Sequence, residues 1–223
     1  RSFYRTKIFP TWRLACDDPM EAVLSAADKY GIKFFIGGGF YGQWDSPGIV
    51  ADPVAAKKRL QAIDEITRVY GHHKSFYGWY WPNEAFIDRH FSNEFIDYVN
   101  TCSRLARQLT PRARIMIAPY GTRVAVPDDQ YVRQLESLDV DIIAYQDEVG
   151  VRKSRVEETS AFYERLRKAH DRARRGALWA DLEIFEVYQY QGIMNKPGSP
   201  AFCGSPGSTR LYTEYMEWLK TRE

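Results

Sequence analysis

A glutamate follows the most aromatic stretch of the chain. Residues 79–81 read Trp-Tyr-Trp, and Pro82, Asn83 and Glu84 come directly after them. Burial against aromatic side chains raises the pKa of a carboxyl group, so that it stays protonated near neutral pH and can donate a proton. We therefore predict that Glu84 is a general acid and that Asn83 binds the substrate beside it. The competing interpretation of Glu84 is a solvated loop carboxylate or an acid in the first turn of a helix.

A second group of acids lies later in the chain, in the segment 178–186. The alternation of this segment places Asp181 and Glu183 on one face. Unpaired acids are costly inside a packed core, so we expect some of them to face water or a site. Cleavage of a glycosidic bond needs two carboxyl groups, one as acid and one as nucleophile or base. We predict Glu183 as the partner of Glu84, with Asp181 as second choice; the competing interpretation is a salt-bridged acid at the rim.

Other residues at the ends of apolar runs could hold a substrate. Gln146 and Asp147 could donate or accept hydrogen bonds with hydroxyl groups, although Asp147 could equally cap the next segment through local backbone bonds. Tyr120 could orient a carboxylate or simply fill the mouth of the fold. Tryptophan rings offer flat apolar surface to a ligand, although a loop tryptophan such as Trp44 could instead pack on its own domain. The predicted substrate-binding residues are Asn83, Tyr120, Gln146, Asp147, Asp181, Trp44, Trp79 and Trp81.

Capped helices alternate with short apolar runs along the whole sequence. Asp18 and Asp52 each precede a proline, which is the usual start of a helix, and we expect Glu21 to close a capping box with Asp18. The glycines at 31 and 71 suit helix ends. The predicted helices span residues 18–30, 52–71, 92–109, 128–138, 157–175 and 209–220. The predicted strands span residues 32–36, 76–81, 114–118, 141–145 and 178–184.

Strands separated by helices of this length imply parallel βαβ units. The two candidate architectures are a (β/α)8 TIM barrel and an open doubly wound sheet. No glycine-rich nucleotide-binding fingerprint follows any strand, and polar residues gather after several strands, as they do in barrels. We therefore predict the α/β class and the (β/α)8 barrel. Because a barrel typically takes about 250 residues and eight strands, we expect residues 1–223 to form one incomplete barrel domain, without its N-terminal and C-terminal strands, from a longer protein.

Composition excludes several other classes of protein. The 223 residues are 44% hydrophobic and 27% charged, which is typical of a folded domain. No apolar run is long enough to span a membrane, and a net charge of +2 argues against a nucleic-acid partner. The basic residues within 165–175 fit a solvated helix face better than a binding patch. We expect a monomer that needs no cofactor.

The sequence also gives no sign of a metal site. Its three cysteines include no CxxC pair, which excludes a zinc ribbon. His72 and His73 are adjacent, so we expect their side chains to point apart, and they follow a helix whose C-terminal end favours cations. We therefore predict no metal ion.

Three blocks of sequence resemble the signature blocks of the DUF4434 family. They are residues 75–84, 144–150 and 178–186, and the resemblance extends over about residues 18–186. The family is a group of bacterial proteins proposed to be glycoside hydrolases with a TIM-barrel fold. This chain departs from the family pattern at Glu148, where a glycine is usual, and at Asn83, where an apolar residue is usual.

The pair Asn83-Glu84 further resembles the Asn-Glu pair that ends the fourth strand in retaining enzymes of clan GH-A. In that clan the second carboxylate ends the seventh strand, which is the place of Glu183 if the predicted strands are the third to the seventh. The resemblance implies a retaining hydrolase of an oligo- or polysaccharide, secreted or periplasmic, with Glu84 as acid/base and Glu183 as nucleophile. The alternatives are a non-catalytic carbohydrate-binding barrel and an interaction module that uses the arginine-rich helix.

Overall fold

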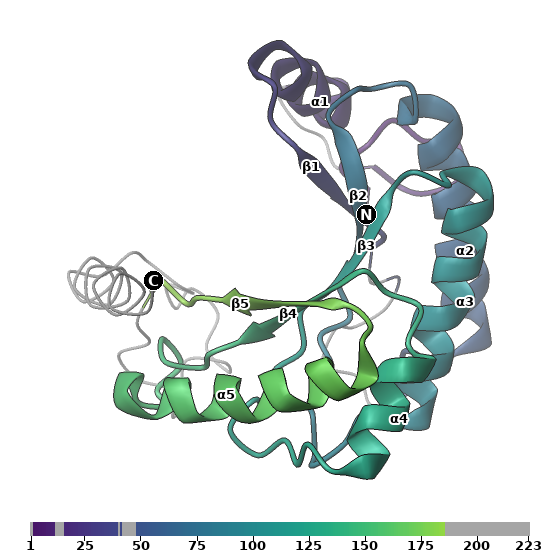
Figure 1. The fold of residues 1–223 in the computed structure, drawn as a ribbon. Coiled ribbons are helices and arrows are strands. Elements are labelled where there is room, and N and C mark those ends of the chain that lie inside the picture. Colours follow the sequence, from purple (N-terminus) through teal and green to yellow (C-terminus); the bar gives the residue numbers. More distant parts are fainter. Residues whose placement is uncertain (1, 12–15, 40, 42–47, 186–223) are drawn as a thin grey trace, which may run out of the picture. The chain divides into compact units, whose positions relative to one another are not determined.

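The computed structural model describes residues 2–11, 16–39, 41 and 48–185 (Figure 1). Helices and strands alternate throughout these residues. The helices are α1 (Pro19–Tyr30), α2 (Pro53–Tyr70), α3 (Asn93–Leu109), α4 (Asp129–Ser137) and α5 (Val156–Ala173). The strands are β1 (Phe34–Gly37), β2 (Phe76–Trp81), β3 (Arg114–Ile117), β4 (Ile142–Gln146) and β5 (Ala177–Asp181). Within the described residues, none of the helices is long and apolar enough to cross a membrane.

The order of the strands confirms the predicted fold class. The strands follow one another in the sheet in chain order, β1-β2-β3-β4-β5, and β1 and β3 each pair with β2 in parallel. An open doubly wound sheet reverses its strand order at a switch point, whereas a (β/α)8 barrel keeps the chain order. The chain therefore has the fold of the (β/α)8 class.

The predicted elements differ from the observed ones at the end of β5, at the cap of α1 and at the start of β1, and by one or two residues at several other ends. Strand β5 ends at Asp181 instead of residue 184. Beyond Asp181 the N–H group of Glu183 faces the side-chain carboxylate of Asp147 at 3.3 Å instead of the backbone of a neighbouring strand. The Asp18 carboxylate caps the N–H group of Glu21 at 3.1 Å, but the Glu21 carboxylate bonds to Ser25 instead of closing a capping box. Strand β1 starts two residues later than predicted. The predicted helix 209–220 lies outside the described residues.

The chain divides into two compact units. Unit 1 comprises Arg1–Asn83, Asn93–Ile117 and Ser137–Ile142, and unit 2 comprises Glu84–Ser92, Ala118–Glu136 and Ile143–Glu223. Helices α1 to α3 and strands β1 to β3 belong to unit 1, whereas α5, β5 and most of α4 and β4 belong to unit 2. That residues 1–223 form a single domain stays a prediction.

The core of unit 1 is built around the aromatic strand β2. Trp79 and Trp81 are 0% and 1% exposed, and their rings stack with centroids 5.7 Å apart. Both indole N–H groups are satisfied inside this core: the Trp79 indole donates to the Thr110 hydroxyl at 2.9 Å, and the Trp81 indole donates to the Ser103 hydroxyl at 3.0 Å. Helices α2 and α3 lie side by side in this unit (Figure 1).

A chain of buried polar side chains holds unit 2 together. The Tyr131 hydroxyl donates to the Tyr145 hydroxyl at 3.0 Å, and the Tyr145 hydroxyl lies 2.9 Å from Nε2 of His170. Burial lowers the pKa of His170, so its neutral ring accepts from Tyr145 and donates from Nδ1 to the carbonyl of Gly176 at 3.1 Å. This chain links α4, β4 and α5, and it fixes the strand end from which Gln146 and Asp147 extend.

Candidate active site

Carboxyl groups that follow three different strands belong to unit 2. Glu84 lies after β2, Asp147 and Glu148 after β4, and Asp181 and Glu183 at or after the end of β5. Four of these acids lie near the Tyr163 side chain on α5. Burial raises the pKa of the Tyr163 hydroxyl, and the negative charges of these four acids raise it further; they are Asp147, Asp181, Glu148 and Glu183. Active sites of barrels lie at the carboxyl ends of the strands. We therefore take these acids as the candidate active site.

Glu84 lies between an amide and another acid. Its side chain is exposed to solvent on one side. Burial of the rest of the group raises its pKa, a hydrogen bond with the Gln146 side chain opposes this effect, and the negative charge of Asp181 adds to it. The Gln146 amide is itself oriented, because Nε2 donates to the carbonyl of Ala118 at 3.1 Å. Of the residues predicted around Glu84, the structure thus brings Gln146 and Asp181 to it.

Asp181 and Asp147 lie on adjacent strand ends but differ in exposure. The N–H group of Asp147 donates to the carbonyl of Asp181 at 3.1 Å. The Asp181 side chain is exposed, and burial of part of it raises its pKa. The Asp147 side chain is fully buried, and its Oδ1 accepts the N–H group of Val149 at 3.0 Å. The Asp147 carboxylate therefore makes the local backbone hydrogen bond that the alternative interpretation expected, and its role in substrate binding stays a prediction.

Glu183 is the most strongly perturbed acid of the group. Its side chain is 8% exposed, and its Oε2 accepts the N–H group of Val151 at 2.8 Å. Burial raises the pKa of Glu183 to about 7 against the lowering effect of Val151, and the charges of Asp147 and Glu148 contribute to the rise. Gly150 makes room for this arrangement, because a Cβ atom there would lie 2.2 Å from the Phe185 carbonyl and 2.9 Å from Cβ of Glu183.

Glu148 belongs to the same cluster and was missed by the sequence analysis. Its side chain is 1% exposed, its Oε2 accepts the N–H group of Gly121 at 2.9 Å, and its Oε1 lies 3.9 Å from the Lys153 ammonium group. The backbone of Glu148 is left-handed, with φ of +57°. Glycine adopts this conformation without strain, which accounts for the glycine that the DUF4434 pattern has here. The departure from that pattern was the signal that could have identified Glu148.

An aromatic surface adjoins Glu84 in the sequence. The Phe86 side chain is 44% exposed, and its ring centroid lies 5.2 Å from that of the half-buried Tyr120. The backbone holds the two rings together, because Tyr120 donates its N–H group to Ala85 and accepts the N–H group of Ile87. The Lys153 ammonium group lies 5.1 Å from the centre of the Tyr120 ring. Tyr120 thus has a place in the candidate site, together with Phe86, which was not among the predicted binding residues.

Two predicted substrate contacts, Trp79 and Trp81, are contradicted by their burial in unit 1. Trp79 and Trp81 are core residues and cannot stack on a ligand. Asn83 is buried, and its side-chain oxygen has no hydrogen-bond partner within the described part of the chain, so its role in substrate binding stays a prediction. Trp44 lies outside the described residues, so its stacking role stays a prediction.

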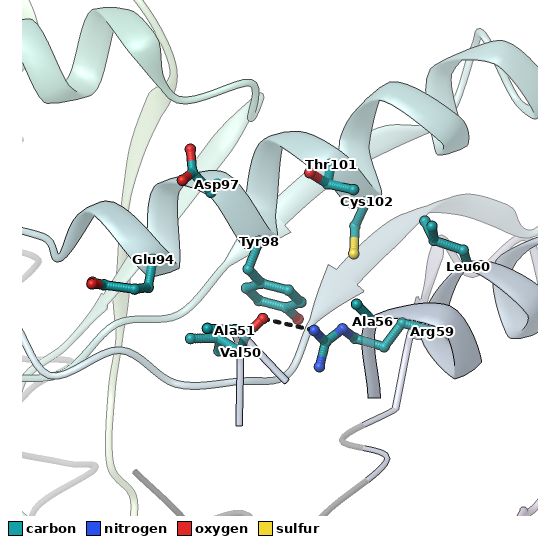
Figure 2. Close-up of a pocket in the computed structure, with 10 residues that line it drawn as sticks. All are labelled: Val50, Ala51, Ala56, Arg59, Leu60, Glu94, Asp97, Tyr98, Thr101 and Cys102. Carbon is teal, nitrogen blue, oxygen red and sulfur yellow. Dashed lines mark hydrogen bonds between the residues drawn. The ribbon is translucent and has the colours of Figure 1, made fainter. Parts of the chain in front are cut away.

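Unit 1 contains a cavity of about 280 Å³ between α2, α3 and residues 50–51 (Figure 2). The buried Arg59 guanidinium donates to the carbonyls of Ile49 and Val50, the latter at 2.8 Å, and lies 4.7 Å from the centre of the Tyr98 ring. Burial raises the pKa of the Cys102 thiol to about 11, so the thiol stays protonated and is a poor nucleophile. The Cys102 thiol therefore does not make this cavity a site of nucleophilic catalysis.

Comparisons with known proteins agree with the fold. Residues 1–196 match the model of a family described as "Domain of unknown function (DUF4434)". No curated protein matches the sequence.

Solved structures with a similar fold include glycosidases. A proposed alpha-L-fucosidase from Bacteroides thetaiotaomicron has a TM-score of 0.60 and 23% identity, over 76% of this chain and 54% of that one. A beta-D-glucuronidase of Dictyoglomus thermophilum has a TM-score of 0.58 and 16% identity, over 90% and 34%. Xylanase XynB from Paenibacillus barcinonensis has a TM-score of 0.53 and 16% identity, over 87% and 62%. The chain thus spans about half the length of the first of these proteins and a third of the second.

Proposed function

Because the chain belongs to the DUF4434 family, we propose that it is a glycoside hydrolase acting on an oligo- or polysaccharide. The observation that carries the proposal is the set of carboxyl groups in unit 2 whose pKa values are raised, namely Glu84, Asp181 and Glu183. Such a set can keep one carboxyl group protonated while another is ionised, which is what glycosidic bond cleavage needs. The barrel fold shared with solved glycosidases supports the proposal.

In the proposed mechanism Glu84 is the acid/base and Glu183 is the nucleophile. Glu84 donates its proton to the leaving oxygen while the Glu183 carboxylate bonds to the anomeric carbon and the glycosidic bond breaks. Glu84 then takes a proton from water, whose oxygen displaces Glu183 from the sugar. The Val151 N–H group supports the ionised form of Glu183. Gln146 positions Glu84 through a hydrogen bond, and the negative charge of Asp181 helps Glu84 to retain its proton.

The solvent-exposed groups near Glu84 suggest how a sugar would be held. The rings of Phe86 and Tyr120 form the aromatic surface against which an apolar face of a sugar would stack. Asp181 is exposed and could accept hydrogen bonds from hydroxyl groups. This surface takes the place of the buried tryptophans in substrate recognition.

The pH dependence of kcat/KM tests the roles of the two acids. Since the pKa of Glu183 is about 7, an ionised nucleophile forms only as the pH rises through that value. We expect kcat/KM to rise as Glu183 ionises, with an apparent pKa of about 7, and to fall at higher pH as Glu84 loses the proton that it donates. A kcat/KM that instead falls through pH 7 would mean that Glu183 acts in its protonated form, and it would exchange the roles of Glu84 and Glu183.

The function itself is tested by release of reducing ends from a panel of oligo- and polysaccharides. We expect wild type to hydrolyse at least one of them and Glu84→Gln to lose about 10²- to 10⁴-fold in kcat. Glu94→Gln is the matched control, because Glu94 is an exposed acid that lines the cavity of unit 1, and we expect it to keep wild-type kcat. Binding of a glycan by wild type without hydrolysis would contradict the proposal and favour a non-catalytic carbohydrate-binding barrel.

A further inference from the structure

Two histidines and a glutamate of unit 1 gather at one place. Glu21 lies in the first turn of α1, and His72 and His73 lie just after α2. The two imidazole rings have centroids 4.3 Å apart and planes inclined by 36°, so the prediction that they point apart is wrong. Adjacent side chains diverge in an extended strand, but residues 71–72 form a turn. One ligand atom from each of the three residues lies within 4.8 Å of the other two.

His73 is held in the orientation that a metal ligand needs. Its Nδ1 lies 2.8 Å from Oδ2 of Asp28, and its Nε2 faces Oε2 of Glu21 at 3.2 Å. Asp28 is fixed in turn, because its other oxygen accepts the N–H group of Ser75. Metal-binding histidines characteristically donate their second ring N–H to a carboxylate, which sets the tautomer and the ring orientation. Asp28 occupies that position toward His73.

His72 brings ring nitrogens that the fold does not use. Its side chain is exposed, and across the described residues it has no hydrogen-bond partner. The other three histidines of the chain are all hydrogen-bonded: His73 to Asp28 and Glu21, His90 to Asp128, and His170 to Tyr145 and Gly176. His72 is therefore available as a ligand without the loss of a hydrogen bond among the described residues.

We propose that Glu21, His72 and His73 bind a zinc-type divalent ion, with Asp28 as a positioning residue. Two imidazole nitrogens and one carboxylate oxygen are a ligand set that zinc accepts, and an open fourth position takes water. With zinc–ligand bonds of about 2.1 Å, neighbouring ligand atoms in a tetrahedral site lie roughly 3.4 Å apart. The Glu21–His73 pair already has this spacing, and the exposed His72 side chain can rotate inward to reach it.

Metal binding at this place would join two segments of unit 1 that are distant in the sequence. Glu21 is in α1, and the histidines lie in the connection between α2 and β2. An ion that binds the folded chain but not the unfolded one stabilises the fold by mass action. The site uses none of the acids of unit 2, so it stands or falls independently of the proposed hydrolase function.

Isothermal titration of the chelator-treated protein with ZnCl₂ tests this proposal, together with thermal unfolding. We expect one zinc ion per chain and a melting temperature higher by about 5 °C at a hundredfold excess of free zinc over Kd. MgCl₂ should produce neither effect, since magnesium prefers oxygen ligands. Absence of zinc binding to the wild-type protein would overturn the proposal.

The His72→Ala variant separates a metal site from a purely structural cluster. Because His72 makes no hydrogen bond, we expect this variant to melt at the wild-type temperature without metal but to bind zinc at least about tenfold more weakly. His90→Ala is the matched control, since it removes a histidine that faces a single acid elsewhere, and it should bind zinc like wild type. Asp28→Asn should weaken zinc binding by about 10- to 100-fold. Zinc binding that is unchanged in His72→Ala would assign the ion to other ligands.

Discussion

The acids around His73 in unit 1 and the acids that follow the strands of unit 2 are the same residue types in opposite surroundings. Hydrogen bonds from His73 lower the pKa of Asp28 to about 2, and hydrogen bonds from Ser25 and His73 lower that of Glu21. In unit 2, burial and neighbouring negative charges raise the pKa of Glu84 and of Glu183. The groups that face a carboxyl group therefore decide whether its pKa lies below or above its ordinary value.

Removing an acid from unit 2 should have the largest effect on turnover. Glu183→Gln keeps the shape of the side chain but removes its negative charge and its nucleophilic oxygen. We expect kcat on an accepted glycan to fall by about 10³-fold or more, with an unchanged circular dichroism spectrum. Wild-type turnover by the folded variant would remove Glu183 from the mechanism.

Moving the backbone beside Glu183, without changing Glu183 itself, should lower both the stability and the turnover rate of the protein. In Gly150→Ala the new methyl group would lie 2.2 Å from the Phe185 carbonyl, so the backbone beside Glu183 must shift. We expect a loss of about 3 kcal/mol in the free energy of unfolding and about tenfold or more in kcat.

Gly37→Ala is the control for this substitution. A Cβ atom at position 37 meets no heavy atom within 4 Å, and the free energy of unfolding should change by no more than about 0.5 kcal/mol. Equal losses in the two variants would show that the crowding around Glu183 is not the cause.

The raised pKa of Glu183 makes stability depend on pH in a defined direction. The folded protein holds this proton up to about pH 7, whereas an unfolded glutamate loses it near its ordinary value of 4.5. The stability that the protonated Glu183 contributes to the folded protein is therefore fully present below pH 4.5 and is lost as the pH rises to 7. In urea unfolding, we expect wild type to lose about 2 kcal/mol more than Glu183→Gln between pH 4.5 and pH 8. Parallel pH profiles of the two proteins would contradict the assignment of this pKa.

The smallest effect should come from the aromatic core of unit 1. Trp81→Phe removes the indole N–H group that bonds to the buried Ser103, and we expect a loss of about 1 kcal/mol in the free energy of unfolding. The KM for an accepted glycan should stay within about twofold of wild type, because the ring is buried. A large increase in KM without a loss of stability would contradict this prediction and show that Trp81 binds the substrate.

Local sequence signals predicted the helices and strands well. The side chain of Asp52 accepts the N–H group of Ala55 at 2.6 Å, as its position before a proline suggested. The alternation of helices and strands predicted a barrel with polar residues after several strands, and Gln146 and Asp181 were among the residues predicted for the site on that basis. The structure adds that the Gln146 side chain hydrogen-bonds to Glu84 and that the negative charge of Asp181 raises the pKa of Glu84.

The remaining features depend on contacts that no local pattern encodes. An aromatic strand end can fill the core or face a ligand, and the sequence of β2 does not decide between the two. The burial of Trp79 and Trp81 depends on their packing against Thr110 and Ser103, which are distant in the sequence. The contact between Glu148 and Gly121 joins two separate loops. The approach of His72 to His73 depends on the turn after α2, which the pair of histidines alone does not specify.

Covalent labelling of the nucleophile tests the central claim most directly. A 2-deoxy-2-fluoro analogue of the hydrolysed glycoside, with a good leaving group, slows the breakdown of the glycosyl-enzyme intermediate more than its formation. After incubation and proteolysis, mass spectrometry identifies the modified residue. We predict a single modification on Glu183 and none in Glu183→Gln. A modification on Glu84 or Asp181, or continued turnover of the glycan with no modification at all, would contradict the account.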